Sequence, residues 1–369
     1  MNNKDNFWKR TEYYLKGKFD RFLFNSVESV YADKPVFRLS VSKGARILII
    51  RSDRIGDILV TTPFLSSLKK QNPNVIIDVV LSTKNIAAKR AFEPYINSFF
   101  VYRKNLLVDF KMLLELRARN YDIVIDTYDN PSSTNAMFIK IINPLYSLGI
   151  QKSKTNRYSI EVPLLNKNKY HIVERINQLA LPFGMEPSNI KKNIEFLLKD
   201  DEIKTAWNFT GGKKKKYRLG INLAGSSMSK FWGFDNYLNL INHISSNYPN
   251  FEILLLNNAE TNEIKDRLIE NTSSFGIPST QDFNIFAAIV NTCDIILTPD
   301  TSVVHLAAAF KIPCIGLFLF SGTKETGIPW TPYNSPHKCL KTKTGVLSNI
   351  DVEEVAASFA ELITEHNLN

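Results

Sequence analysis

The sequence has few of the residues from which metal sites and disulfide frameworks are built. Its 369 residues include only three cysteines, Cys293, Cys314 and Cys339, and five scattered histidines. An odd number of distant cysteines without a C-x-x-C pair argues against disulfides and against zinc, and it fits a reducing compartment. We therefore expect a cytoplasmic protein that binds no metal.

Long apolar runs are also missing. No stretch approaches the roughly 18 apolar residues of a membrane-spanning helix, and residues 1–14 lack the apolar run of a signal peptide. Neither the P-loop pattern GxxxxGK[ST] nor the dinucleotide pattern GxGxxG occurs. These absences argue against an integral membrane protein, a P-loop NTPase and a dinucleotide-dependent dehydrogenase.

Positive charge is in excess, with a formal net charge of +10, which favours nucleic acid, an anionic membrane face or a phosphorylated substrate as partner. Residues 1–45 contain nine basic, five acidic and nine aromatic residues. A helical wheel separates them into two faces, with Trp8, Leu15, Phe19 and Phe22 on one and Lys9, Arg10, Lys16 and Arg21 on the other. This pattern predicts an amphipathic helix that either contacts an anionic membrane or packs on the following domain.

From residue 46 onward, short apolar runs alternate with helical patterns, which is typical of parallel sheets covered on both faces. The expected strands are 46–51, 75–81, 122–126, 219–223, 251–256, 294–297 and 314–319. A polar stretch with four consecutive lysines divides them into two series. The sequence therefore predicts two facing Rossmann-like domains with a ligand beyond the carboxyl ends of the strands.

The expected boundaries follow from this pattern. They are 1–45 for the N-terminal segment, 46–200 for the first domain, 201–217 for a linker, 218–350 for the second domain and 351–369 for a C-terminal helix.

Three loops after expected strands carry polar residues that a ligand in the cleft would meet. In the first loop, RSDRIGD, Gly56 would allow close backbone approach, and Asp57 begins a helix either as its N-cap or as a general base. In the second loop, the small residues Gly225 and Ser226 suit a phosphate contact, and Lys230 would be either a phosphate-binding cation or a solvated side chain.

The third loop, TPDTSVVH, leads from a strand into an alanine-rich helix. It carries Asp300, Thr301, Ser302 and His305. The amides and the positive dipole end of such a helix favour a diphosphate, whereas a lone helical histidine is often structural.

In this order the loops resemble glycosyltransferase family 9, which contains the bacterial heptosyltransferases that build lipopolysaccharide core from ADP-heptose. The resemblance covers about residues 46–365. It rests on RILIIRSDRIGDILVTTPFLSSLKK, YDIVIDTYDN, HIVERINQLALPFGMEP, GINLAGSSMSKFWGFDNY, CDIILTPDTSVVHLAAAFKIPCIGLF and PWTPYNSP. The combination of IGD-x-x-x-x-T-P with D-[ST]-x-x-x-H-L-A-A-A is its most specific part.

The resemblance implies a GT-B fold and an inverting transfer without an essential metal or cofactor. Asp57 maps to the proposed base of the family and Lys230 to the lysine that binds the donor phosphate. Asp300, Thr301 and His305 map to residues that line the donor site.

Some features depart from the family pattern, and one further element is implied by it. Ser302 stands where the family often has glycine, and strand 251–256 leads into a loop without glycine, after which Glu263 is expected to meet the ribose hydroxyls. GT-B enzymes often pack the C-terminal helix back on the first domain, and we expect this of residues 351–366.

We therefore expect an inverting glycosyltransferase that moves heptose from ADP-heptose to a lipid-anchored lipopolysaccharide-type acceptor, at the inner face of the cytoplasmic membrane. Two alternatives are a family relative with another nucleotide sugar and a non-catalytic nucleotide-sugar-binding protein. Retention of Asp57 argues against the second, because binding alone needs no base. A nucleic-acid binder is disfavoured, because the lysine run is local and no nucleic-acid motif is visible.

Overall fold

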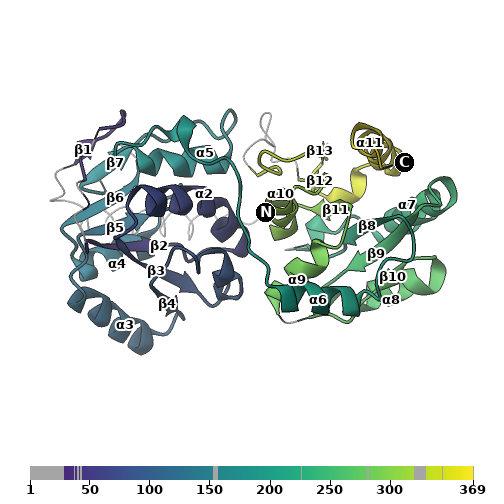
Figure 1. Cartoon of the computed structure of the whole chain (residues 1–369), viewed down its shortest axis with the longest axis horizontal. Helices are drawn as coiled ribbons and strands as arrows, with labels where there is room; N and C mark the ends of the chain where they lie inside the picture. The colour runs from purple at the N-terminus through teal and green to yellow at the C-terminus, as the bar shows by residue number, and fades with distance from the viewer. Residues whose placement is uncertain are drawn as a thin grey trace, which may run out of the picture.

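A computed structural model describes residues 29–36, 38–39, 41, 44–152, 157–225, 227–280, 282–319, 330–342 and 344–368. This part of the chain forms two lobes, each built on a parallel sheet (Figure 1). The first sheet has the order β1-β7-β6-β5-β2-β3-β4, with β1 (Val30–Tyr31), β2 (Arg46–Ile50), β3 (Ile76–Ser82), β4 (Ser98–Tyr102), β5 (Ile123–Asp126), β6 (Tyr146–Ile150) and β7 (Ile160–Val162). The second has the order β10-β9-β8-β11-β12-β13, with β8 (Tyr217–Asn222), β9 (Phe251–Leu256), β10 (Phe275–Gly276), β11 (Ile295–Pro299), β12 (Cys314–Phe318) and β13 (His337–Lys341).

Helices cover both sheets. The first lobe contains α2 (Ile55–Gln71), α3 (Leu106–Ala118), α4 (Ser133–Ile142) and α5 (Ile172–Asn177). The second contains α6 (Asp200–Phe209), α7 (Phe234–Asn247), α8 (Asn262–Asn271), α9 (Phe283–Val290), α10 (Ser302–Phe310) and α11 (Val352–Glu365). Among the described residues, none of these helices is long and apolar enough to cross a membrane. The two parallel-sheet α/β domains expected from the sequence are confirmed.

Strand β2 shows why an unbroken apolar run forms the centre of a sheet. Ile47 and Ile49 belong to the core shared with α2 and α5. Leu48 and Ile50 point to the opposite face and belong to the core shared with α3 and α4. Because side chains alternate along a strand, both faces of a doubly covered sheet require apolar residues.

Helix α2 contains a proline that the neighbouring threonine accommodates. Pro63 has no N–H to give to the carbonyl of Leu59, and the Thr62 hydroxyl donates to that carbonyl at 2.7 Å instead. The same hydroxyl accepts the Glu195 N–H at 2.9 Å, from the segment that crosses to the second lobe. The Thr62 hydroxyl therefore replaces the hydrogen bond that Pro63 cannot make, and it also binds the crossing segment to α2.

The start of the first lobe and the start of the second differ from the boundaries expected from the sequence. β1, which lies before residue 46, already pairs with β7 at the edge of the first sheet. Helix α6 overlaps the expected linker 201–217, but it packs on α9 of the second lobe. Its Trp207 lies beneath the Arg218 guanidinium, whose carbon is 5.3 Å from the ring centroid. The exposed lysine run 213–216 is a loop after this helix. The amphipathic helix expected near the N-terminus falls in residues 1–28, outside the described residues.

The expectation that the C-terminal helix returns to the first domain is wrong. Helix α11 packs on α7, β12 and β13 of the second lobe (Figure 1). Its buried residues Val355, Phe359 and Leu362 belong to the core of that lobe, and Phe359 meets Phe251 and Tyr248 edge-on, each with centroids 5.1 Å apart. The apolar face of α11 is therefore buried against the second sheet.

Candidate functional site

A cavity of about 1050 Å³ lies between the two lobes. The loops that line it follow β2, β3 and β5 of the first sheet and β8, β9 and β11 of the second. These are the carboxyl ends of parallel strands, where α/β sheets bind their ligands. The predicted residues that line the cavity together are Gly56, Asp57, Gly225, Lys230, Asp300, Thr301, Ser302 and His305.

The carboxylate of Asp57 is held at the N-terminus of α2. It accepts the backbone N–H of Arg54, the N-cap residue, at 3.1 Å, so Asp57 caps the helix from inside its first turn. The buried Arg51 guanidinium lies 3.2 Å from the other carboxylate oxygen and also donates to the Asp57 carbonyl at 2.9 Å. Asp57 is therefore not the N-cap suggested by the sequence but the third residue of α2; its carboxylate caps the helix start and the residue lines the cavity.

Gly56 of the first lobe and His305 of the second lie against each other where α2 meets α10. A Cβ on Gly56 would lie only 3.0 Å from the His305 ring, so a larger residue would push α2 away from α10. Burial lowers the pKa of His305 to about 4, and the imidazole is therefore neutral near pH 7. The missing side chain at Gly56 therefore lets α10 pack against α2. The sequence analysis expected it to let a ligand approach the backbone.

Lys230 forms an ion pair on the second-lobe side of the cavity. Its ammonium group donates to the Asp300 carboxylate at 2.6 Å and to the Asp300 carbonyl at 2.8 Å. Gly225 makes this turn possible, since a Cβ there would lie 2.9 Å from the Cβ and carbonyl oxygen of Lys230. An ammonium group has three hydrogens, so one is left over for a ligand.

Helix α10 directs its N-terminus at the same cavity. Thr301 is its N-cap, and the hydroxyl accepts the Val303 N–H at 3.3 Å. Asn222, at the end of β8, donates to the hydroxyls of Thr298 and Thr301 at 2.9 and 3.1 Å. The start of α10 is therefore braced, and its positive dipole end lies where an anion would sit.

Asp53 is a cavity residue that the sequence reading did not single out. One carboxylate oxygen lies 3.4 Å from Arg51, and the other is buried without a hydrogen-bond partner. Burial raises the pKa of Asp53 to about 7; Arg51 opposes this rise, and the charge of Asp57 adds to it. The sequence does contain a pattern that could have identified it. Asp53 lies four residues before Asp57, in the connection between β2 and α2.

One predicted donor-site residue, Glu263, is placed differently. Glu263 is exposed on α8 and does not line the cavity, whereas Glu260, one turn earlier, does. Ser226 lies outside the described residues. Asn257, Asn258, Phe283 and Phe286 also line the cavity. Within the described part of the chain, no cluster of three or more His, Cys, Asp or Glu side chains is arranged to hold a metal ion.

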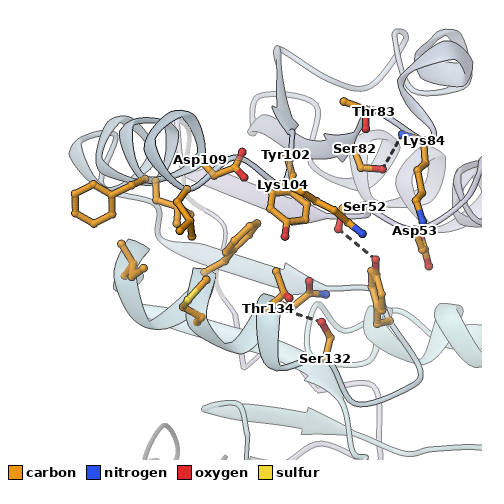
Figure 2. A pocket seen from close by; sticks show the side chains of 18 of the residues that line it. Ser52, Asp53, Ser82, Thr83, Lys84, Tyr102, Lys104, Asp109, Ser132 and Thr134 are labelled. Atoms are coloured by element: carbon orange, nitrogen blue, oxygen red, sulfur yellow. Dashed lines mark hydrogen bonds between the residues drawn. The ribbon is translucent and has the colours of Figure 1, made fainter. Parts of the chain in front are cut away.

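A second cavity of about 640 Å³ opens in the first lobe between α3 and α4 (Figure 2). It shares Asp53, Arg54, Lys84, Tyr128 and Ser132 with the larger cavity, so the two adjoin. The residues that line it include polar Ser52, Thr83, Tyr102, Lys104, Ser132, Thr134 and Asn135, and apolar Leu106, Phe110, Leu113, Met137, Phe138 and Ile141.

The profile of the family described as glycosyltransferase family 9 (heptosyltransferase) matches residues 110–355. Lipopolysaccharide heptosyltransferase 3 of Escherichia coli K12 is 23% identical over 284 residues, which are 71% of this chain and 79% of that protein.

Solved structures share the fold. The glycosyltransferase family 9 protein of Veillonella parvula superposes with a TM-score of 0.73 at 18% identity, over 88% of this chain and 99% of that one. The heptosyltransferase WaaC of Escherichia coli, solved with ADP, gives a TM-score of 0.65 at 19% identity, over 87% of this chain and 98% of that one. The arrangement of the two lobes is therefore the GT-B fold.

Proposed function

Because the chain belongs to glycosyltransferase family 9, and is therefore a glycosyltransferase, we propose that it transfers heptose from ADP-heptose to a lipopolysaccharide core or related cell-surface glycan, with inversion. One observation carries this proposal. A carboxylate, a lysine and two helix N-termini, those of α2 and α10, converge on one cavity between the domains.

The diphosphate of the donor binds at Lys230 and at the start of α10. Lys230 is held by Asp300 and keeps one N–H for a phosphate oxygen. When the sugar–phosphate bond breaks, negative charge grows on the departing ADP. A fixed ammonium group and a helix N-terminus stabilise that charge without a metal ion or another cofactor.

The nucleoside occupies the part of the cavity lined by Asn257, Asn258 and Phe283. Glu260 takes the role that the sequence assigned to Glu263 and accepts hydrogen bonds from the ribose hydroxyls. Adenine is favoured among the bases because the structural neighbour WaaC was solved with ADP.

Asp57 serves as the general base. An acceptor hydroxyl gives its proton to the Asp57 carboxylate as its oxygen bonds to the anomeric carbon, and the bond from that carbon to the ADP oxygen breaks. Arg51 and the Arg54 amide fix the carboxylate, and each of its oxygens retains a lone pair for the incoming proton.

The acceptor sugar enters from the second cavity. Asp53 lies at the junction of the two cavities with an unpartnered oxygen, suited to hold a second hydroxyl of the acceptor. Lys84 and Lys104 give this cavity positive charge, which suits an acidic or phosphorylated glycan. An acceptor of this kind is lipid-anchored, so the enzyme works at the cytoplasmic face of the membrane, and residues 1–45 are one candidate for membrane contact.

A donor screen tests the proposal. Purified protein is mixed with ADP-heptose, other ADP-sugars, UDP-sugars or GDP-sugars, with and without a lipid A–Kdo acceptor, and the released nucleoside diphosphate is measured. We expect release only with ADP-heptose and acceptor together, and EDTA should leave it largely intact. Turnover of a different nucleotide sugar would replace the donor assignment, and tight binding without turnover would favour a non-catalytic binding protein.

A further inference from the structure

Helix α3 exposes large apolar side chains to solvent over its first turns. Leu106 is 89% exposed, Leu107 84% and Phe110 55%. Val108 and Leu114 are also exposed. Contiguous exposed apolar patches are rare on monomeric soluble proteins and mark interaction surfaces.

The opposite face of α3 already has a partner. Met112, Leu113 and Leu116 are buried against the first sheet and α4. The helix is therefore apolar on two faces, and only one of them is explained by the fold. We call the other face, formed by Leu106, Leu107 and Phe110, the α3 ridge.

The exposed charges from Arg103 to Lys111 are all positive, and the next acidic residue, Glu115, pairs with Arg119 at 3.3 Å. Arg103, Lys104 and Lys111 are exposed. Asp109, the single acidic residue between 103 and 114, is buried and accepts the N–H groups of Arg103 and Asn105 at 2.9 and 2.8 Å. A surface that combines exposed leucines with basic side chains complements the interface of an anionic bilayer.

The α3 ridge continues into the second cavity. Leu106 and Phe110 line the cavity as well as the surface, and Asp53 lies at the opposite end, beside the cavity between the domains. Figure 2 shows Asp109 of α3 on one side of the cavity and Asp53 and Lys84 on the other. A molecule anchored in a bilayer under the ridge could therefore extend its polar part toward Asp53.

We propose that the α3 ridge docks on an anionic lipid surface and thereby holds the mouth of the second cavity against the membrane. Leu106, Leu107 and Phe110 enter the interface between headgroups and acyl chains, and Arg103, Lys104 and Lys111 meet the anionic headgroups. The purpose of this docking rests on the proposed function, but lipid binding itself does not.

Co-sedimentation with vesicles tests the proposal. The full chain is compared with the triple variant L106S/L107S/F110S on phosphatidylcholine vesicles with and without phosphatidylglycerol. A matched control, L145S/L197S/F209S, removes three exposed apolar side chains that lie elsewhere on the surface. We expect the full chain and the control to bind the anionic vesicles and to dissociate with added salt, and the ridge variant to bind at least about tenfold more weakly.

Two results would overturn the proposal. One is equal binding by the ridge variant and the full chain, which would place lipid contact elsewhere, such as in residues 1–28. The other is no vesicle binding at all, with self-association of the full chain that the ridge variant loses, which would make a second copy the occupant. Transfer to a water-soluble acceptor fragment is measured in parallel; its failure in the full chain would contradict the proposed function and leave the vesicle result standing.

Discussion

At the scale of single residues, Asp57 allows the proposed chemistry to be separated from helix capping. Asn keeps a side-chain oxygen that can accept the Arg54 N–H but cannot take a proton. We expect Asp57→Asn to lower kcat by about 10²–10⁴-fold while ADP binding, measured by calorimetry, survives. The melting temperature should fall, because the buried Arg51 guanidinium loses one of its two carboxylate partners. Near-normal turnover would remove Asp57 from the mechanism.

Lys230 offers a second test at this scale. Its loss removes a charged donor from the proposed diphosphate site, and we expect Lys230→Ala to weaken ADP binding by about 1.5–3 kcal/mol. Lys213 is a matched control, because it pairs with Asp294 at 2.7 Å on the surface and does not line the cavity. Equal affinities of the two variants in calorimetry would contradict the placement of the diphosphate.

Asp53 predicts a pH dependence of acceptor use. Its pKa of about 7 means that the carboxylate forms as the pH rises through neutrality. If the carboxylate holds the acceptor, kcat/KM for the acceptor rises as the pH increases through about 7. In Asp53→Asn, kcat/KM should lack this rise and stay low at every pH. A step that persists in Asp53→Asn would assign it to another group.

At the scale of elements, the Thr-Pro pair of α2 predicts a cost in stability that is unrelated to catalysis. In Thr62→Val, the Leu59 carbonyl loses the donor that replaces the missing Pro63 amide, and the Glu195 N–H loses its acceptor. We expect the free energy of unfolding to fall by about 1–3 kcal/mol in denaturant titrations.

Thr61→Val is the matched control for that prediction. Thr61 is equally buried, but its hydroxyl donates to the Asp57 carbonyl, which also accepts from Arg51. That carbonyl stays bonded when the hydroxyl is removed, so the loss should be smaller. Equal losses of stability in the two variants would show that the Thr62 hydroxyl does not compensate for the missing N–H of Pro63.

At the scale of the whole molecule, His171 joins the two lobes. Its Nδ1 accepts the Val173 N–H at 3.2 Å, so Nε2 carries the hydrogen and donates to the Thr331 carbonyl of the second lobe at 2.9 Å. The ring also stacks on Tyr333 with centroids 4.6 Å apart. Burial, with the nearby His305 adding to it, lowers the pKa of His171 to about 3.

A pKa lowered on folding means that the unfolded chain binds more protons, so stability is lost as the pH falls below about 6.5. Between about pH 7.5 and 5, wild type should lose about 2 kcal/mol more than His171→Asn. The raised pKa of Asp53 has the opposite effect, because it increases stability as the pH falls. This effect is the same in wild type and in His171→Asn, so it cancels in the difference between them. The exposed His243→Asn serves as control, and a wild-type pH profile in His171→Asn would refute the prediction.

The sequence by itself determined the two α/β domains and the order of the three cleft loops. Apolar runs such as 251–256 form strands with the predicted bounds because the signal is local: every residue of β9 is buried. Loop residues such as Asp57 and Thr301 were predictable because a strand end and the following helix N-terminus are neighbours along the chain. Their position relative to a parallel sheet follows from its geometry alone.

Only the tertiary structure decided which distant residues meet. The partner of α11 was set by the apolar surface left on the second sheet. That Glu260 lines the cavity and Glu263 does not depends on how the turn before α8 is placed against the other loops. The role of Gly56 depends on His305 in the other lobe, and the raised pKa of Asp53 depends on burial between two cavities. These properties arise from contacts between separate segments, which no local pattern encodes.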